Sequence, residues 1–200
     1  MILFWTLAVG LASAVPENLA FEKWFVERGV AVEIARSPGP IPWLRAAGEL
    51  PAPASEIESV LLDFSAYRDL MAPAVLKADV LGSGERTARL HFVWHYPFPL
   101  RNRDAIVGYR AERLADGRFR LTWQDEVRPG DPSEGVRIAR VAGDTIVASA
   151  GPDRCRVTYT YYADLGGSFP RSAEEKAWRA EPVGYFRALR RRLHLLDPMQ

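Results

Sequence analysis

A tyrosine-rich segment at 154–164 constrains the fold more than any other part of the chain. β-branched and aromatic residues alternate there with more polar ones, and a period of two is typical of a strand with one buried face. The positions on the apolar side are Cys155, Val157, Tyr159 and Tyr161. The glycine pair at 166–167 and Pro170 predict that the strand ends there.

Beyond this break, apolar residues recur at intervals of three and four, which predicts one amphipathic helix over 172–196. These residues are Val183, Phe186, Leu189, Leu193 and Leu196. Pro182 has no amide hydrogen to donate, so we expect a kink or break near residues 180 and 181. A strand, a glycine turn and a terminal helix together predict a helix laid across a sheet.

The preceding part of the chain shows mainly strand patterns separated by glycine and proline turns. We expect short helices at 18–28, 55–63 and 67–71. We expect strands at 30–35, 43–50, 75–81, 87–96, 105–114, 119–127, 136–141 and 145–149. Because strands follow one another before the long helix, this order predicts an α+β fold with an antiparallel sheet.

Composition limits the domain organisation and the class of partner. The 200 residues are 48% hydrophobic and 26% charged, which suits one globular domain, here 15–200, with a substantial core. The formal net charge of +1 gives no reason to expect a nucleic-acid partner. With Cys155 as its single cysteine, the chain cannot form an intrachain disulfide. We expect a monomer.

The first residues resemble a secretory signal peptide. An uncharged apolar run at 2–12 ends in Ala-Ser-Ala at 12–14, which is the pattern of a short apolar region before a cleavage site. The run is shorter than the roughly 20 residues that a membrane-spanning helix needs. We therefore expect 1–14 to be removed and the protein to be exported to the periplasm or secreted. A buried N-terminal helix is the alternative.

Four segments, taken in order, resemble a START domain, the lipid-transfer module related to steroidogenic acute regulatory protein in the Bet v 1-like superfamily. They are the strands 29–34 and 43–50, the helix and turn at 61–67, the Pro-rich turn 96–104 with its Arg103-Asp104 pair, and 162–170 before the last helix. One departure is Trp178, which stands near a position where the family often has asparagine.

The resemblance implies a helix-grip fold, in which a curved antiparallel sheet wraps around the C-terminal helix and encloses an apolar cavity. It also implies non-enzymatic carriage or sensing of a lipid or other apolar molecule. Strand alternation puts an aromatic face toward that cavity, although ordinary cores show the same pattern. The candidate ligand-binding residues are Leu90, Phe92, Trp94, Tyr96, Arg103, Val107, Tyr109, Trp123, Tyr159, Tyr161, Phe186 and Leu189.

Two other functions stay open. The same superfamily includes polyketide aromatase/cyclases, and an enzyme of that kind would use cavity side chains. Its candidates are Tyr109, Tyr159, Tyr161 and Arg103. A protein-interaction module with a filled core is the other alternative. The Arg103-Asp104 pair could orient a ligand head group or brace the turn that contains it.

Other chemistry finds little support in the sequence. On a strand His91 and His95 would lie roughly 13 Å apart, too far to share one zinc ion, so we expect no metal site. No motif for a cofactor or a catalytic nucleophile is present, and Cys155 lies on the apolar side of its strand. The cations Arg187, Arg190, Arg191 and Arg192 either form a solvated helix end or meet an anionic membrane transiently.

Overall fold

The computed structural model describes residues 15–36, 39–96, 98–166 and 171–195, with the backbone alone at Arg171 and Ser172. The expected signal peptide at 1–14 and the end of the expected terminal helix at 196 lie outside these residues. Within them, no helix has both the length and the apolar character needed to cross a membrane.

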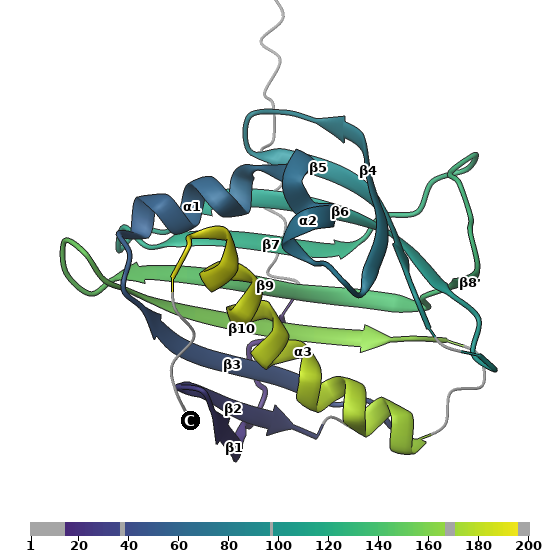
Figure 1. The fold of residues 1–200 in the computed structure, drawn as a ribbon, viewed down its shortest axis with the longest axis horizontal. Coiled ribbons are helices and arrows are strands. Elements are labelled where there is room, and N and C mark those ends of the chain that lie inside the picture. The colour runs from purple at the N-terminus through teal and green to yellow at the C-terminus, as the bar shows by residue number, and fades with distance from the viewer. Residues whose placement is uncertain (1–14, 37–38, 97, 167–170, 196–200) are drawn as a thin grey trace, which may run out of the picture.

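One curved sheet forms most of the molecule (Figure 1). Its strands are β1 (Glu22–Glu27), β2 (Val30–Ala35), β3 (Trp43–Leu50), β4 (Val75–Ser83), β5 (Thr87–Trp94), β6 (Arg103–Arg113), β7 (Phe119–Asp125), β8 (Val136–Arg137), β9 (Arg140–Ser149) and β10 (Cys155–Asp164). Their order across the sheet is β1-β2-β3-β10-β9-β7-β6-β5-β4, with every neighbouring pair antiparallel. The short β8 pairs in parallel with β6.

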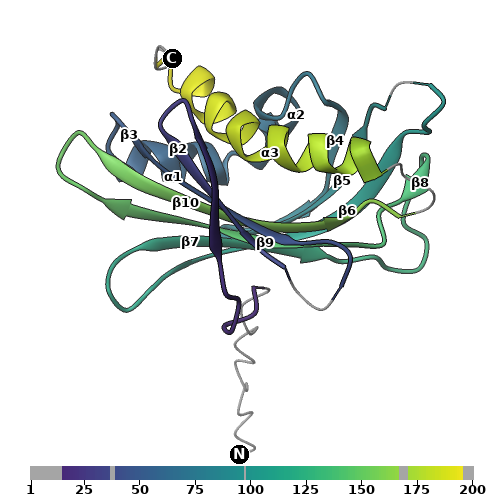
Figure 2. The same ribbon diagram turned by 90° about the horizontal axis from the view of Figure 1, so that it is seen from below.

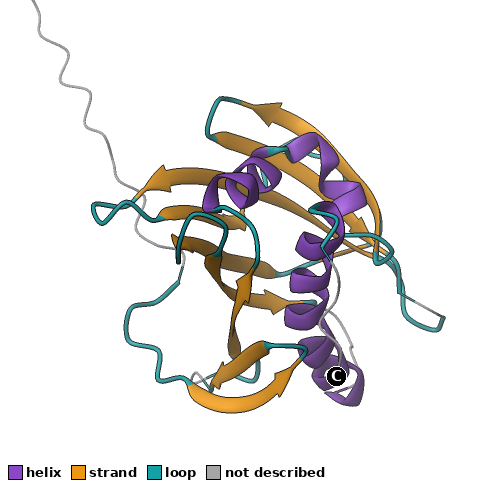
Figure 3. Ribbon diagram, turned by 60° about the vertical axis from the view of Figure 1, so that its left-hand side comes forward, coloured by secondary structure: helices purple, strands orange, loops and turns teal. Residues whose placement is uncertain are grey.

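The helices gather on the concave side of this sheet. They are α1 (Ala54–Leu62), the 3-10 helix Phe64–Ala66, α2 (Tyr67–Leu70) and α3 (Arg171–Arg192). Seen from below, the sheet bows beneath α3 (Figure 2), and the view coloured by secondary structure shows the strands bending around the helices (Figure 3). Helix α3 contacts β2, β3, α1 and α2. The predicted α+β, helix-grip arrangement is therefore confirmed.

A glycine sets how closely α3 approaches the sheet. The ring of Phe186 is fully buried, and it lies over Gly48 of β3, where an added Cβ would come 2.9 Å from the ring atom Cε1. Any larger residue at Gly48 would push the ring, and the helix with it, away from the strand. This contact fixes which face of α3 meets β3.

Helix α3 continues through Pro182, so the break expected near 180 and 181 does not occur. A residue with an amide hydrogen at 182 would donate it to the carbonyl of Trp178, four residues earlier. That carbonyl instead accepts a 3.1 Å hydrogen bond from the hydroxyl of Tyr161 on β10. The sheet thus supplies the donor that the proline cannot.

The helix expected at 18–28 is wrong, because its residues 22–27 form β1. Strand β1 pairs with β2 through the two-residue turn Arg28-Gly29, where both residues have positive φ angles of 50° and 73°. Such a turn matches the twist of a hairpin. A glycine can end a helix or stand in a tight hairpin turn, so Gly29 alone does not distinguish the two.

The strand expected at 136–141 is also wrong, and the one expected at 145–149 begins earlier than predicted. Residues 140–149 form the single strand β9, while 136–137 pair separately with β6. Gly143 is the reason, since it lies within β9 directly beneath the indole of Trp123, where an added Cβ would come 2.4 Å from a ring atom. Here glycine makes room for a ring rather than ending a strand. The other expected strands are confirmed to within a few residues.

Candidate ligand site between the sheet and the terminal helix

Apart from Arg103, which is itself buried, the candidate ligand-binding residues divide by burial into three groups. Five are buried to 2% exposure or less and belong to the main core: Leu90, Phe92, Val107, Phe186 and Leu189. Three aromatic residues retain 6–7% exposure: Trp123, Tyr159 and Tyr161. Three more are only half-buried: Trp94, Tyr96 and Tyr109. A reachable aromatic surface therefore exists among side chains that otherwise pack as a core.

These rings form a continuous wall from β6 to α3. Tyr109 and Trp123 have their centroids 6.3 Å apart, and Trp123 stacks on Tyr159 at 5.4 Å. Tyr159 also stacks face to face with Tyr185 of α3, with centroids 3.9 Å apart and an interplanar angle of 9°. At the other end of the wall, Tyr109 contacts Phe64 and Tyr67. Helix and sheet thus share one aromatic surface.

The tyrosine hydroxyls on this wall have specific partners. Tyr185 shares a 2.7 Å hydrogen bond with Thr145 of β9, and Tyr67 donates to the carbonyl of Leu61 at 2.7 Å. Burial raises the pKa of Tyr67, Tyr109, Tyr159, Tyr161 and Tyr185. All five hydroxyls are therefore neutral at physiological pH. In this form they act as hydrogen-bonding groups rather than as bases.

Glu181 lies at the centre of this arrangement and was not among the candidates. Its Oε1 accepts a 3.2 Å hydrogen bond from the hydroxyl of Tyr159, which places the carboxyl between α3 and the sheet. Burial raises the pKa of Glu181, and the smaller effect of the Tyr159 hydrogen bond lowers it. Yet Glu181 is an exposed residue. Both observations hold if the carboxyl is surrounded by protein but faces a space that a small molecule can enter.

Small residues on α3 leave room beside Glu181. Ala180 and Gly184 are both exposed, and a Cβ added at Gly184 would meet no atom within 4 Å. Glycine inside a helix costs about 1 kcal/mol relative to alanine. Helix formation alone does not favour glycine at 184, and it is at this position that the open space lies.

Arg103 and Asp104 point to opposite sides of the sheet and take different roles. The guanidinium of Arg103 donates to the carbonyls of Arg101, Leu165 and Gly166 and lies over the ring of Tyr96 at 5.6 Å. These contacts hold the chain that leads from β10 toward α3. This is the geometry expected of a bracing residue.

Asp104 belongs to a buried polar cluster on the convex side. Its Oδ2 lies 3.1 Å from Nε2 of His91 and 2.8 Å from the guanidinium of Arg137, and both His91 and Asp104 have no exposed side-chain surface. His91 therefore lies on the outward face of β5, as its alternation predicts, but the chain around β8 covers it. A buried acidic group with two basic partners fixes this covering segment.

The arginines at the end of α3 are used largely within the protein. Arg190 is buried and donates to the carbonyl of Arg28. Arg191 donates to the carbonyls of Asp69 and Leu70 at 2.9 Å each, and also to that of Ala72. Arg192 pairs with Asp63 at 3.1 Å. These cations tie α3 to the β1–β2 turn and to the α1–α2 region.

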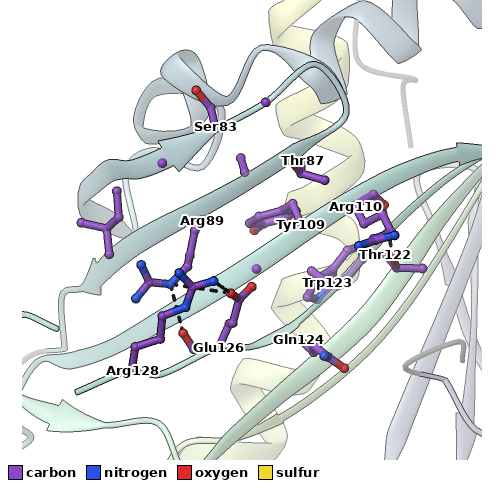
Figure 4. Close-up of a pocket in the computed structure, with 15 residues that line it drawn as sticks. Ser83, Thr87, Arg89, Tyr109, Arg110, Thr122, Trp123, Gln124, Glu126 and Arg128 are labelled. Atoms are coloured by element: carbon purple, nitrogen blue, oxygen red, sulfur yellow. Dashed lines mark hydrogen bonds and ion pairs between the residues drawn. The ribbon is translucent and has the colours of Figure 1, made fainter. Parts of the chain in front are cut away.

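A separate groove of about 450 Å³ lies on the convex side of β5, β6 and β7 (Figure 4). Its polar lining includes Arg89, Arg110, Glu126 and Arg128. Arg89 pairs with Asp131 and donates to the carbonyl of Glu126 at 3.2 Å, while Arg128 pairs with the Glu126 carboxylate. Tyr109 and Trp123 of the aromatic wall also border this groove, whereas Glu181 does not line it.

Comparison with known proteins agrees with this geometry. No family model matches the sequence, and no curated protein matches it. Among solved structures, the STAR-related lipid transfer protein from Xanthomonas axonopodis shares 26% identity, with a TM-score of 0.74 over 87% of this chain and 98% of that one. The lipid transfer and protein localization domain of human StarD13 has a TM-score of 0.73 at 17% identity, over 85% of this chain and 87% of that one.

The chain has the START fold. A more distant match is the Zhui aromatase/cyclase from a Streptomyces species, with a TM-score of 0.53 at 14% identity over 74% of this chain and 91% of that one. The START proteins are thus closer in structure than the cyclase. In the START fold of this chain, the aromatic wall and Glu181 occupy the space between the gripping sheet and the terminal helix.

Proposed function

We propose that the protein binds one lipid or other apolar small molecule between the concave face of the sheet and α3, and carries or senses it without chemistry. The observation that carries the proposal is the accessible aromatic wall, with Trp94, Tyr96 and Tyr109 half-buried on the inner face and open space at Gly184. Such apolar surfaces with a few polar groups are typical of small-molecule sites. The START neighbours, which are lipid transfer proteins by name, support the same ligand class.

A cyclase-like enzyme is less well supported. The tyrosines proposed for that role are held neutral by burial, which raises their pKa. Arg103 already donates to three backbone carbonyls. General acid–base catalysis is most efficient when the pKa of the catalytic group lies near the working pH, and burial moves the pKa of these tyrosines further from it. Binding without turnover is therefore the better account.

Native mass spectrometry of the protein purified from its own host tests the proposal. We expect a population heavier than the chain by the mass of one lipid-sized molecule. Gly184→Trp places an indole in the open space and should reduce that population. Gly82→Trp is the control, because Gly82 is exposed on β4 and an added Cβ there also meets no atom within 4 Å; it should leave the population unchanged. A clean apo mass that persists after incubation with a lipid extract would instead favour the filled-core interaction module.

We further propose that the chain is exported and that it exchanges its ligand at an anionic membrane surface. The apolar run at 2–12 and Ala-Ser-Ala at 12–14 support export. Arg187, Arg191 and Arg192 are exposed near the end of α3, although the last two also bond within the protein, and they support the membrane contact. Fractionation of producing cells, with N-terminal sequencing of the protein, tests export. Cosedimentation with phosphatidylglycerol vesicles, compared with phosphatidylcholine vesicles, tests the contact with an anionic membrane.

A further inference from the structure

We propose that Glu181 binds the head group of the ligand, and that this head group is a hydrogen-bond donor, either a hydroxyl or an ammonium. The inference rests on the proposed binding function and defines the class of ligand. It is carried by the position of the Glu181 carboxyl between α3 and the aromatic wall, together with the free hydrogen-bonding capacity of that carboxyl.

The two oxygens of Glu181 differ in their surroundings. Oε1 accepts the hydrogen bond from Tyr159. Within the described residues, Oε2 has no hydrogen-bond partner and Glu181 has no ion-pair partner, although the side chain is exposed. A carboxylate has about four acceptor sites, so most of this capacity is available to a molecule in the adjacent space. An approaching donor would thus find an acceptor already oriented by Tyr159.

The electrostatic surroundings select the kind of donor. Besides burial, which has the larger effect, the charge of Glu181 raises the pKa of five tyrosines around it: Tyr96, Tyr109, Tyr159, Tyr161 and Tyr185. Among the described residues no cation forms an ion pair with Glu181, and an unpaired carboxylate is stabilised by a positive ligand and disfavours a negative one. We therefore infer that ammonium and hydroxyl head groups are accepted, whereas carboxylate and phosphate head groups are excluded.

Gly184 provides the room that the ligand needs next to this acceptor. It lies three residues after Glu181, on nearly the same face of α3, and a Cβ there would meet no atom within 4 Å. The stacked rings of Tyr159 and Tyr185 lie next to Glu181, since Tyr159 donates its hydroxyl to the Glu181 carboxyl. An apolar chain packed along these rings would place its polar end at Glu181.

A series of ligands with one chain and different head groups tests the inference. Octadecylamine, octadecanol and octadecanoic acid are titrated into the delipidated full-length protein, with tryptophan fluorescence as the readout. We expect the amine and the alcohol to bind at least tenfold more tightly than the acid. Glu181→Gln, which keeps an acceptor but loses the charge, should abolish the preference for the amine while leaving the alcohol within a few-fold. Glu181→Leu should also weaken the alcohol at least tenfold.

Glu175→Gln is the matched control, because it removes the same charge from an exposed position on the same helix. It should leave all three affinities unchanged, and thermal unfolding should show that every variant is folded. Saturable binding with equal affinity for the three head groups, or an order that Glu181→Leu does not change, would overturn the inference while leaving the proposed function standing. No saturable binding of any of the three would contradict both.

Discussion

The hydroxyl of Tyr161 donates a 3.1 Å hydrogen bond to the carbonyl of Trp178, the acceptor that Pro182 leaves without a helical donor. This bond connects β10, near the middle of the sheet, to the helix that the sheet grips. It also explains how a proline is accommodated within a continuous helix, because the carbonyl that it frees is satisfied from outside.

Tyr161→Phe should therefore lower the free energy of unfolding by about 1 kcal/mol, the usual value of a buried hydrogen bond. In a Pro182→Ala background the helix recovers its own amide donor, so the same substitution should cost clearly less. Urea unfolding of the four proteins of this double-mutant cycle measures the difference. An equal cost of Tyr161→Phe in both backgrounds would show that the proline and the tyrosine are not coupled.

The space beside Gly184 leads to a prediction about stability. Gly184→Ala should raise the free energy of unfolding by about 0.5–1 kcal/mol, because alanine favours the helix and the added methyl group meets no neighbour. Gly117→Ala is the contrasting control, since Gly117 has a φ angle of 83° and should lose stability on substitution. Chemical denaturation of both variants checks the pair. Loss of stability at Gly184 would mean that the space there is already filled.

The patterns that repeat along an element could be predicted from the sequence, whereas features set by neighbouring elements could not. Alternation identified β5 and β10, and the order of motifs identified the START fold. The single strand β9 was not predicted, because in the sequence a glycine such as Gly143 resembles the end of a strand. The need for a glycine at this position is clear only in the folded sheet, where the ring of Trp123 lies over Gly143.

Glu181 was missed for a related reason. In the sequence it is one acidic residue among many in a charged helical stretch, and such residues usually face solvent. Its place between helix and sheet depends on the rotation of α3 about its axis. Contacts from distant parts of the chain fix that rotation, above all the packing of Phe186 over Gly48. No local pattern carries this information.

Cys155 should be unreactive in the folded protein. It is fully buried at the start of β10, and burial raises the pKa of its thiol to about 11. Since the thiolate is the reactive form, a thiol reagent such as Ellman's reagent at pH 8 should label it only after denaturation. Rapid labelling of the native protein would show that the strand end opens readily. The same experiment on Tyr161→Phe reports whether loss of that hydrogen bond increases opening.

Glu181 gives the last prediction, which concerns the dependence of stability on pH. Burial raises its pKa above the ordinary value of 4.5. For an acid with a raised folded-state pKa, the contribution to stability is complete below the unfolded-state pKa and is lost as the pH rises through the folded-state pKa. Glu181→Gln cannot titrate and so avoids this loss. We therefore expect the melting temperature of Glu181→Gln, relative to that of the unsubstituted protein, to rise between pH 4 and pH 8.

The tyrosines that respond to Glu181 do not interfere over this range, because burial raises their pKa further above the ordinary value of 10. Glu175→Gln, on the exposed part of the same helix, should show no such rise. The prediction is tested by calorimetry, which measures the melting temperatures of the three ligand-free proteins between pH 4 and pH 8. A constant difference between Glu181→Gln and the unsubstituted protein would mean that the carboxyl is as well solvated as one on the surface. A rise would show that the Glu181 carboxylate lowers the stability of the ligand-free protein, which is the cost expected of a group kept for ligand binding.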